Sequence, residues 1–243
     1  MPADHTRGTR ESLEAPSIAR LIDQTLLKPD ASQTAIEALC RDAVEIGFAT
    51  VCVNPVWVTL CAALLRGTKV GVCSVVSFPL GATTAEIKGH EARRAILDGA
   101  SEIDMVMNIG ALKSGDLRAA REDLEAVISI CRTDGVVSKV IIEAALLTDE
   151  EKVRACLGAK EAGADFVKTS TGFGPGGATL ADVALMRRTL GPSPAIKAAG
   201  GVRTLDALLA LVAAGATRIG TSAGVGIVQE AQGRIWRIRK ALD

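Results

Sequence analysis

The chain has no tyrosine, and aromatic residues make up only 2% of its 243 residues. Binding of single-stranded nucleic acid by base stacking needs aromatic side chains, so the sequence gives it little support. Lysine plus arginine equals aspartate plus glutamate, 28 against 28, which leaves no excess of positive charge for a phosphate backbone. We therefore expect no nucleic-acid partner.

Histidine, paired cysteine motifs and long apolar runs are scarce as well. Only two histidines, His5 and His90, are available for a His-based metal site or a Ser-His-Asp triad, so the sequence gives both sites little support. The charged stretch around His90 is typical of a helix surface. The six cysteines include no CxxC pair, as in reduced cytoplasmic proteins. No apolar run approaches about 18 residues, and residues 1–16 show no secretory pattern. We therefore expect a cytoplasmic protein that does not enter a membrane.

Aliphatic residues are abundant, and they recur in a repeated unit. Four segments share a helical pattern, then a glycine, then a short apolar run: EIGFATVCV (45–53), LDGASEIDMV (97–106), EAGADFVKT (161–169) and AAGATRIGT (213–221). The glycines fit the position just after a helix, where a positive φ is common. Weaker copies contain Gly135 and Gly191. Helices alternating with buried strands predict βαβ units and a parallel sheet.

Eight strands are predicted, centred on Leu21–Asp23, Thr50–Val53, Val70–Val76, Ile103–Met107, Val140–Ile142, Phe166–Thr169, Ala195–Ala198 and Arg218–Gly220. Eight units in a chain of this length predict a single-domain α/β fold, the (β/α)8 TIM barrel, which typically has about 250 residues. We place the barrel over residues 18–243 and an N-terminal arm over residues 1–17. A doubly wound sheet is the alternative, but its usual GxGxxG turn is replaced here by DQTLLKPDAS.

Charged residues fall at several predicted strand ends, where a TIM barrel carries its active site. Side chains alternate between the two faces of a strand, and the apolar face packs against the helices. This alternation points Asp104, in EIDMV, into the barrel. Lys168, in DFVKTS, and Lys197, in AIKAAGG, point the same way. We therefore expect these three side chains to converge at the barrel mouth.

Two lysines and a carboxylate in a confined site suit Schiff-base chemistry. A neutral amine attacks a carbonyl, and a neighbouring ammonium and desolvation both lower the pKa of a lysine. The carboxylate and the second lysine can then move protons. The alternative is structural: Lys168 and Asp104 form a buried ion pair, and Lys197 is a second partner, since such networks also perturb pKa values.

Glycine-rich loops follow the last three strands. The loops after strands 7 and 8 commonly hold a phosphate group in this fold. Gly200, Gly201 and Gly220 allow close approach of the backbone, and Ser222 offers a hydroxyl. Glycines at both places indicate a phosphorylated substrate.

Taken together, these segments resemble the deoxyribose-phosphate aldolase family of class I, Schiff-base aldolases. The resemblance rests on IDQTLLKPDAS, VCVNP, SFPLGATTAEIKGHEA, DMVMNIGALKSGD, IIEAALLTDEEK, FVKTSTGF, IKAAGGVRT and RIGTSAGVGIV, and covers nearly the whole chain. It implies a (β/α)8 barrel that interconverts 2-deoxy-D-ribose 5-phosphate with acetaldehyde and D-glyceraldehyde 3-phosphate. It also implies that no metal or organic cofactor is needed, and that the chain forms a homodimer.

The resemblance further implies roles for individual residues. Lys168 matches the Schiff-base nucleophile, while Asp104 and Lys197 match a proton relay. The expected substrate-binding residues are Asp23, Thr25 and Cys52 near the sugar hydroxyls, and Thr171, Gly172, Gly200, Gly201, Gly220 and Ser222, which include the phosphate site. The chain departs from some relatives in carrying Phe173 where they have lysine, which removes one phosphate contact.

Alternatives remain open at this stage. Cys52 is either a target for covalent inactivation by aldehydes or a small buried apolar residue. The rival functions are another Schiff-base aldolase or transaldolase, a sugar-phosphate-binding barrel without catalysis, and a metal-dependent aldolase, which the two histidines disfavour.

Overall fold

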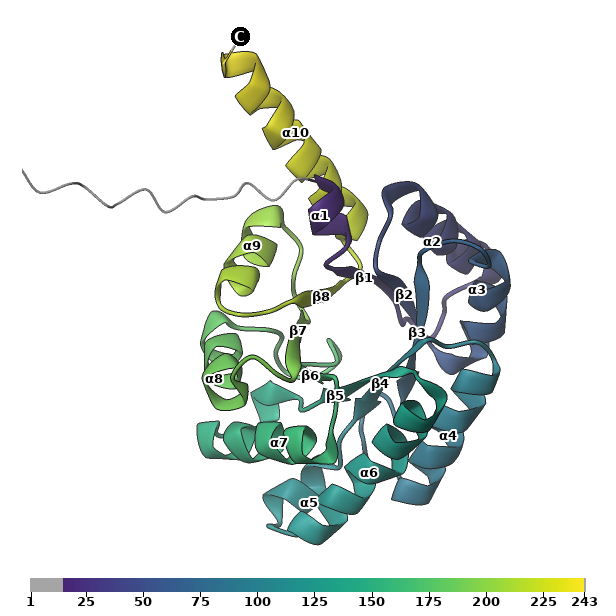
Figure 1. Ribbon diagram of the computed structural model, residues 1–243, viewed down its shortest axis with the longest axis vertical. Coiled ribbons are helices and arrows are strands. Elements are labelled where there is room, and N and C mark those ends of the chain that lie inside the picture. Colours follow the sequence, from purple (N-terminus) through teal and green to yellow (C-terminus); the bar gives the residue numbers. More distant parts are fainter. Residues whose placement is uncertain (1–14, 243) are drawn as a thin grey trace, which may run out of the picture.

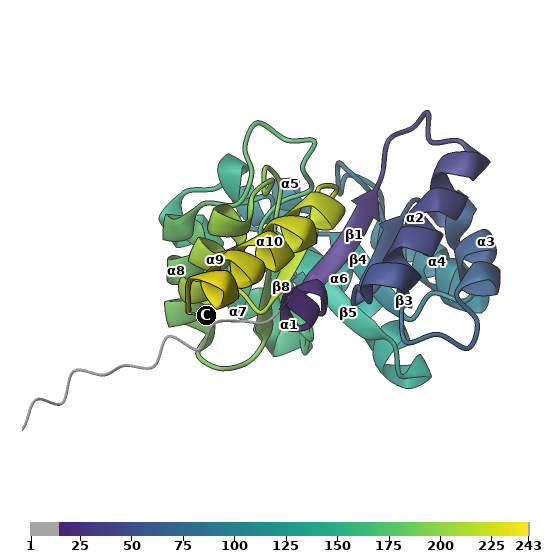
Figure 2. The same cartoon turned by 90° about the horizontal axis from the view of Figure 1, so that it is seen from above.

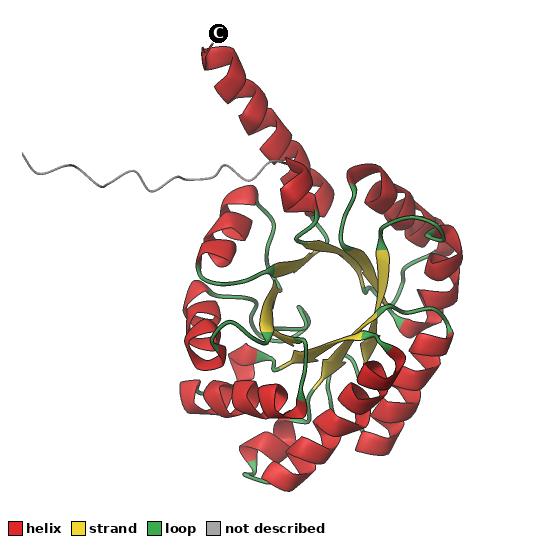
Figure 3. Cartoon of the chain, viewed as in Figure 1, coloured by secondary structure: helices red, strands yellow, loops and turns green. Residues whose placement is uncertain are grey.

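The computed structural model describes residues 15–242, with side chains described up to Arg234. Eight parallel strands close into a barrel in the order of the chain, and helices surround it (Figures 1 and 3). The strands are β1 (Ile22–Leu26), β2 (Thr50–Val53), β3 (Gly71–Val76), β4 (Glu102–Val106), β5 (Val137–Ile141), β6 (Phe166–Lys168), β7 (Ala195–Ala199) and β8 (Arg218–Thr221). The predicted TIM barrel is confirmed.

The helices fill the connections between the strands. They are α1 (Ala15–Ala19), α2 (Gln33–Ile46), α3 (Val58–Leu64), α4 (Ala85–Leu97), α5 (Ile109–Lys113), α6 (Leu117–Asp134), α7 (Asp149–Ala162), α8 (Leu180–Leu190), α9 (Leu205–Ala213) and α10 (Gly224–Leu242), with short 3-10 turns at Pro55–Trp57 and Ala144–Leu146. Within residues 15–242, no helix is both long and apolar enough to cross a membrane.

Local sequence signals explain where the helices begin and end. The Ser32 hydroxyl accepts from Ala35 N at the start of α2, and Thr148 and Glu151 form a capping box at the start of α7. Gly47 and Gly163 follow these helices with φ values of 81° and 84°, which a side chain with a Cβ rarely adopts. The repeated helix-glycine-strand unit of the sequence therefore corresponds to one α-to-β connection of the barrel.

The first strand is longer than predicted and begins one residue later. The prediction centred it on Leu21–Asp23 and read the polar residues that follow as its end, but β1 runs from Ile22 to Leu26. Thr25 pairs with Cys52 of β2, and the Gln24 side chain accepts a hydrogen bond from Gly224 N. Gln24 and Thr25 thus have partners in α10 and β2, and the strand continues through both residues.

Alternation along each strand separates an apolar outer layer from a polar interior. On β4, Ile103 and Met105 pack into the large core between the barrel and the helices. Asp104 faces the barrel interior and is fully buried. Inside the barrel, Cys52 and Cys73 belong to a small separate apolar cluster. The interior thus combines this apolar side, formed by β2 and β3, with charged groups from the other strands.

The predicted N-terminal arm falls mainly outside the described residues. Residues 1–14, including His5, are not described, while residues 15–17 begin α1. Ala15 and Ile18 are buried, and α1 lies beside α10, whose far end extends away from the barrel (Figure 1). The barrel domain assigned to residues 18–243 stays a prediction at its boundaries.

Candidate active site

A cavity of about 350 Å³ opens at the carboxyl ends of the strands. The loops that follow β1 and β6 rise at this end of the barrel (Figure 2). The predicted site residues that line the cavity are Thr25, Lys168, Thr171, Gly172, Gly200, Gly201, Gly220 and Ser222. Asp23, Cys52, Asp104 and Lys197 lie deeper in the barrel and do not line it.

Asp104 brings the two predicted lysines together. Its Oδ2 atom lies 2.7 Å from Lys168 Nζ and 2.7 Å from Lys197 Nζ. All three side chains are nearly or completely excluded from solvent. The convergence predicted from strand alternation is therefore present, and Lys168 is the member that reaches the cavity wall. The predicted ion pair between Lys168 and Asp104 is present as well.

A third lysine, Lys139 of β5, was not predicted. Its Nζ lies 2.8 Å from Asp104 Oδ1, 2.5 Å from Glu102 Oε2 and 3.3 Å from Cys73 Sγ. The Cys73 thiol also donates to Asp104 Oδ1, at 3.1 Å. The available signal was a lysine within the apolar run VVSKVII, but the predicted strand was centred two residues too late to include it.

The ion pairs form a closed ring of alternating charge across the barrel. The contacts run from Asp104 to Lys197, Asp23, Arg218, Glu102, Lys139 and back to Asp104. Arg218 Nη1 lies 2.6 Å from Asp23 Oδ1 and 3.1 Å from Glu102 Oε2. Each buried charge thereby has two partners of opposite sign, which offsets the cost of removing it from water.

The ring is electrically balanced without Lys168. It contains three carboxylates and three basic groups, and Lys168 is attached to it as a seventh member through Asp104. Lys168 is thus the lysine of the cluster that contacts a single carboxylate, Asp104, whereas Lys139 and Lys197 each contact two.

The pKa values of the ring members follow from burial and their partners. Burial opposes the charged form of Asp104, but Lys139, Lys168 and Lys197 hold its pKa well below the ordinary value. Burial likewise opposes the charged form of Lys197, but Asp104 and Asp23 raise its pKa. Lys197 is therefore held as a charged ammonium, because two carboxylates contact it.

Asp23 occupies a different place from the one predicted. It is the second residue of β1, fully buried, with Oδ2 2.5 Å from Lys197 Nζ. Despite burial, Lys197 and the other nearby cations lower its pKa. Asp23 therefore contacts the lysine of the predicted relay, and Thr25, two residues farther along the strand, is the residue that reaches the cavity.

Cys52 is completely buried and packs with Leu27, Cys73 and Val75. A hydrogen bond with the Cys73 thiol lowers the pKa of Cys52, against the effect of burial. Its position as a small buried residue is thus clear, while its reaction with aldehydes stays a prediction.

The described residues offer one group with metal-ligand spacing, which consists of Cys52, Cys73 and Asp104. Both Asp104 oxygens already contact lysine ammonium groups, so a divalent cation here would face like charge at close range. His90 lies on α4, mostly exposed, 3.8 Å from Glu86. These residues do not fit a metal centre, and His90 is the helix-surface residue that was expected.

The outer part of the cavity is built by the glycine loops. Gly172 and Gly200 have φ values of 86° and 89°, and a Cβ on Gly172 would lie 3.8 Å from Gly200 Cα. The loops after β6 and β7 are therefore in direct contact. Backbone N–H groups that a Cβ does not cover can approach an anion.

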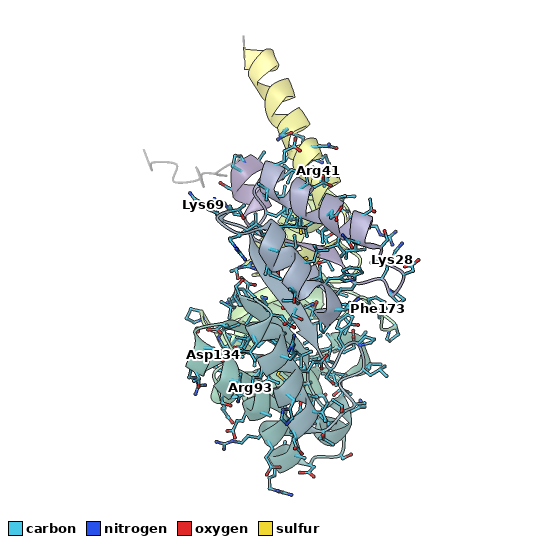
Figure 4. All side chains as sticks on the ribbon, turned by 90° about the vertical axis from the view of Figure 1, so that its right-hand side faces the viewer. Lys28, Arg41, Lys69, Arg93, Asp134 and Phe173 are labelled. Atoms are coloured by element: carbon cyan, nitrogen blue, oxygen red, sulfur yellow. The ribbon has the colours of Figure 1, made fainter. Side chains whose placement is uncertain are left out.

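Lys28 and Arg203 also line the cavity, and neither was predicted as a site residue. Lys28 lies at the same end of the molecule as Phe173, away from Lys69 and Asp134 (Figure 4). The Phe173 ring packs edge-on against Phe78, with centroids 5.4 Å apart. The cavity rim thus has a cationic part and an apolar part.

Residues 18–230 match the sequence pattern of the DeoC/LacD family aldolases. The chain belongs to this aldolase family. It is 57% identical over 213 residues to the deoxyribose-phosphate aldolase of Geobacillus sp., covering 88% of this chain and 95% of that protein. It is 59% identical over 210 residues to the deoxyribose-phosphate aldolase of Streptococcus pneumoniae, covering 86% and 94%.

Solved structures of aldolases have the same barrel as this family member. The tetrameric deoxyribose phosphate aldolase from Aeropyrum pernix superposes with a TM-score of 0.84 at 32% identity, covering 90% of this chain and 92% of that one. The aldolase QR15 superposes with a TM-score of 0.85 at 40% identity, covering 90% and 97%. The family resemblance inferred from the sequence is confirmed.

Proposed function

We propose that this aldolase reversibly cleaves 2-deoxy-D-ribose 5-phosphate into acetaldehyde and D-glyceraldehyde 3-phosphate, through a Schiff base on Lys168. One observation carries the choice of lysine: of the three lysines that contact Asp104, Lys168 is the one that lines the cavity. The names of the relatives support the choice of substrate.

In the cleavage direction, the Lys168 amine adds to the C1 aldehyde of the open-chain sugar, and loss of water leaves a protonated imine. Removal of the C3 hydroxyl proton breaks the C2–C3 bond, because the imine accepts the electron pair. Glyceraldehyde 3-phosphate leaves, and an enamine remains on Lys168. Protonation of the enamine carbon and hydrolysis of the imine then release acetaldehyde and regenerate the amine.

Asp104 and Lys197 would serve these steps as a proton relay. Asp104 Oδ2 lies 2.7 Å from both amines, so it can pass a proton between Lys197 and Lys168. The lowered pKa of Asp104 keeps the carboxylate ionised in the resting enzyme, and the raised pKa of Lys197 keeps that amine protonated. Because neither residue lines the cavity, the relay reaches the substrate through Lys168 or a water molecule.

The substrate phosphate would lie at the glycine loops after β6, β7 and β8. Gly172, Gly201, Gly220 and Ser222 line this part of the cavity. Arg203 lies in the same wall and supplies positive charge. This cation offsets the phosphate contact that is lost with a phenylalanine at position 173.

We also propose a homo-oligomer in the cytoplasm, with a dimer as its smallest form. The described structure contains six free cysteines, all buried, which is the usual state of thiols in a reducing compartment. Size-exclusion chromatography with light scattering would measure the mass, and a monomeric mass at working concentration would refute the dimer.

Borohydride trapping tests the proposed chemistry. The enzyme is incubated with 2-deoxyribose 5-phosphate or acetaldehyde, reduced, and mapped by peptide mass spectrometry. We expect a reduced adduct on Lys168 that is absent from Lys168→Ala, while Lys113→Met, which changes an exposed lysine, keeps it. An adduct on Lys197 would exchange the two lysine roles. No adduct on either lysine of the folded enzyme would refute the aldolase proposal.

A further inference from the structure

Glu143, which follows β5, has a backbone conformation that is unusual for its residue type. Its φ and ψ are 48° and 64°, in the left-handed region, and Ser77 is the other described residue besides glycine with a positive φ. Such a conformation is strained for a residue with a Cβ and persists where the surrounding structure requires it. Contacts around Glu143 must therefore hold it in this conformation, and such strained positions cluster at functional sites.

The backbone at Glu143 forms a bulge beside the Schiff-base strand. Ile142 N donates to Lys168 O at 3.0 Å, and Ala144 N donates to Thr169 O at 2.8 Å. Two N–H groups two residues apart thus bind consecutive carbonyls just past the ends of β5 and β6, so the backbone at Glu143 departs from the regular parallel ladder as in a bulge. Bulges of this kind redirect a side chain and are common next to active sites.

The redirected carboxylate binds the loop after β6. Glu143 is 3% exposed, and its Oε2 accepts from Thr171 N at 3.2 Å and from the Thr171 hydroxyl. Thr171 Oγ1 in turn accepts from Phe173 N at 3.0 Å. A Cβ at Gly174 would lie 2.9 Å from Glu143 Oε1, so this glycine makes room for the carboxylate. Glu143 therefore holds Thr171 directly, and the Thr171 hydroxyl in turn holds the backbone at Phe173.

These bonds also decide what Thr171 can offer to a ligand. Its one hydroxyl proton goes to Glu143, and one lone pair takes the N–H of Phe173. Toward the cavity, Thr171 can then only accept a hydrogen bond. Thr171, Gly172 and Phe173 all line the cavity, and Ala178 N, farther along the same loop, donates to Gly200 O of the loop after β7 at 3.0 Å. Glu143 thus holds the loop after β6, which contacts a second loop expected to hold the phosphate.

We propose that Glu143 is a positioning residue for the phosphate-binding loops, acting through Thr171, an inference that rests on the proposed function. Its carboxylate holds Thr171 as a hydrogen-bond acceptor and keeps the loop after β6 in place beside the loop after β7. Its role lies in binding the phosphorylated sugar rather than in the proton transfers at Lys168.

Two variants separate the carboxylate from the backbone conformation. Glu143→Gly keeps the left-handed backbone without strain and removes the carboxylate, while Glu143→Gln keeps an acceptor oxygen of the same reach. The measurement is kcat and KM for 2-deoxyribose 5-phosphate and for 2-deoxyribose, with thermal unfolding as a check on the fold. We compare the ratio of kcat/KM for the two sugars, because a general loss of folded enzyme leaves this ratio unchanged.

For Glu143→Gly we expect the ratio to fall about tenfold, mainly through KM for the phosphorylated sugar, since two hydrogen bonds to the loop are lost. For Glu143→Gln we expect a fall of about threefold, because a neutral acceptor replaces a charged one. If Glu143→Gly does not fold, Glu143→Gln decides. A parental ratio in the deciding variant would overturn the proposal. A parent enzyme without cleavage or a Lys168 adduct would instead refute the proposed function.

Discussion

Replacement of Lys139 by methionine tests the balanced ring most directly. The variant removes one of its three basic groups, and Asp104 and Glu102 lose contacts of 2.8 Å and 2.5 Å. Breaking a buried pair typically costs about 3–5 kcal/mol. Asp104 keeps Lys197 at 2.7 Å and Glu102 keeps Arg218 at 3.1 Å, so we expect a loss near the lower end, about 3 kcal/mol.

The same change should impair catalysis through the charge balance. Without Lys139, three carboxylates face two basic groups of the ring, and Asp104 Oδ1 loses the ammonium that helps to hold this carboxylate beside Lys168 and Lys197. We expect kcat to fall by about tenfold or more, because a small displacement of a catalytic group is costly, and we expect slower trapping of acetaldehyde by borohydride.

The double variant Lys139→Met with Glu102→Gln restores the balance by removing one charge of each sign. We expect it to regain part of the stability and most of the trapping rate at pH 7. Lys113→Met serves as the control, because this half-exposed lysine pairs with Glu151 at 2.9 Å and such pairs contribute about 0–1 kcal/mol. Urea unfolding and single-turnover trapping measure the two effects. A double variant as slow as Lys139→Met would refute the charge argument.

Two further predictions concern pH and the glycine loops. The pKa of Asp23 is lowered by folding, so its stabilising contribution is present above about pH 4 and is lost as the pH falls. The difference in unfolding free energy between the parent and Asp23→Asn should therefore shrink below about pH 4. A difference that does not depend on pH would contradict this. A Cβ at Gly177 would lie 2.2 Å from Gly200 O, so Gly177→Ala should destabilise the enzyme by about 1–3 kcal/mol and raise KM for the sugar phosphate. Gly226→Ala is the control: nothing lies within 4 Å of a Cβ at this position, so this variant should change neither stability nor KM.

Much of the barrel could be predicted because its signals are local. A glycine after each helical pattern ends the helix, as at Gly47 and Gly163, and the apolar run that follows is the next strand. The exception, β1, shows the limit of this reasoning. The polar residues Gln24 and Thr25 were read as the strand's end, but their partners come from α10 and β2, far along the chain.

The candidate site also has a part that local sequence signals predict and a part that they do not. Side-chain alternation within single strands determined that Asp104, Lys168 and Lys197 face the interior, because that property depends only on neighbours in sequence. Lys139 was missed, because site residues were sought at the ends of the strands and this lysine lies in the middle of β5.

What the sequence alone determined is thus the fold class, the order of the elements and the convergence of Lys168 and Lys197 with Asp104. Tertiary structure alone decided that the charges close into a ring, that Lys168 rather than Lys197 reaches the cavity, and that Glu143 binds the neighbouring loop. The reason is physical: alternation sets the direction of a side chain, but the stagger of the strands in the closed barrel sets its height and its partners.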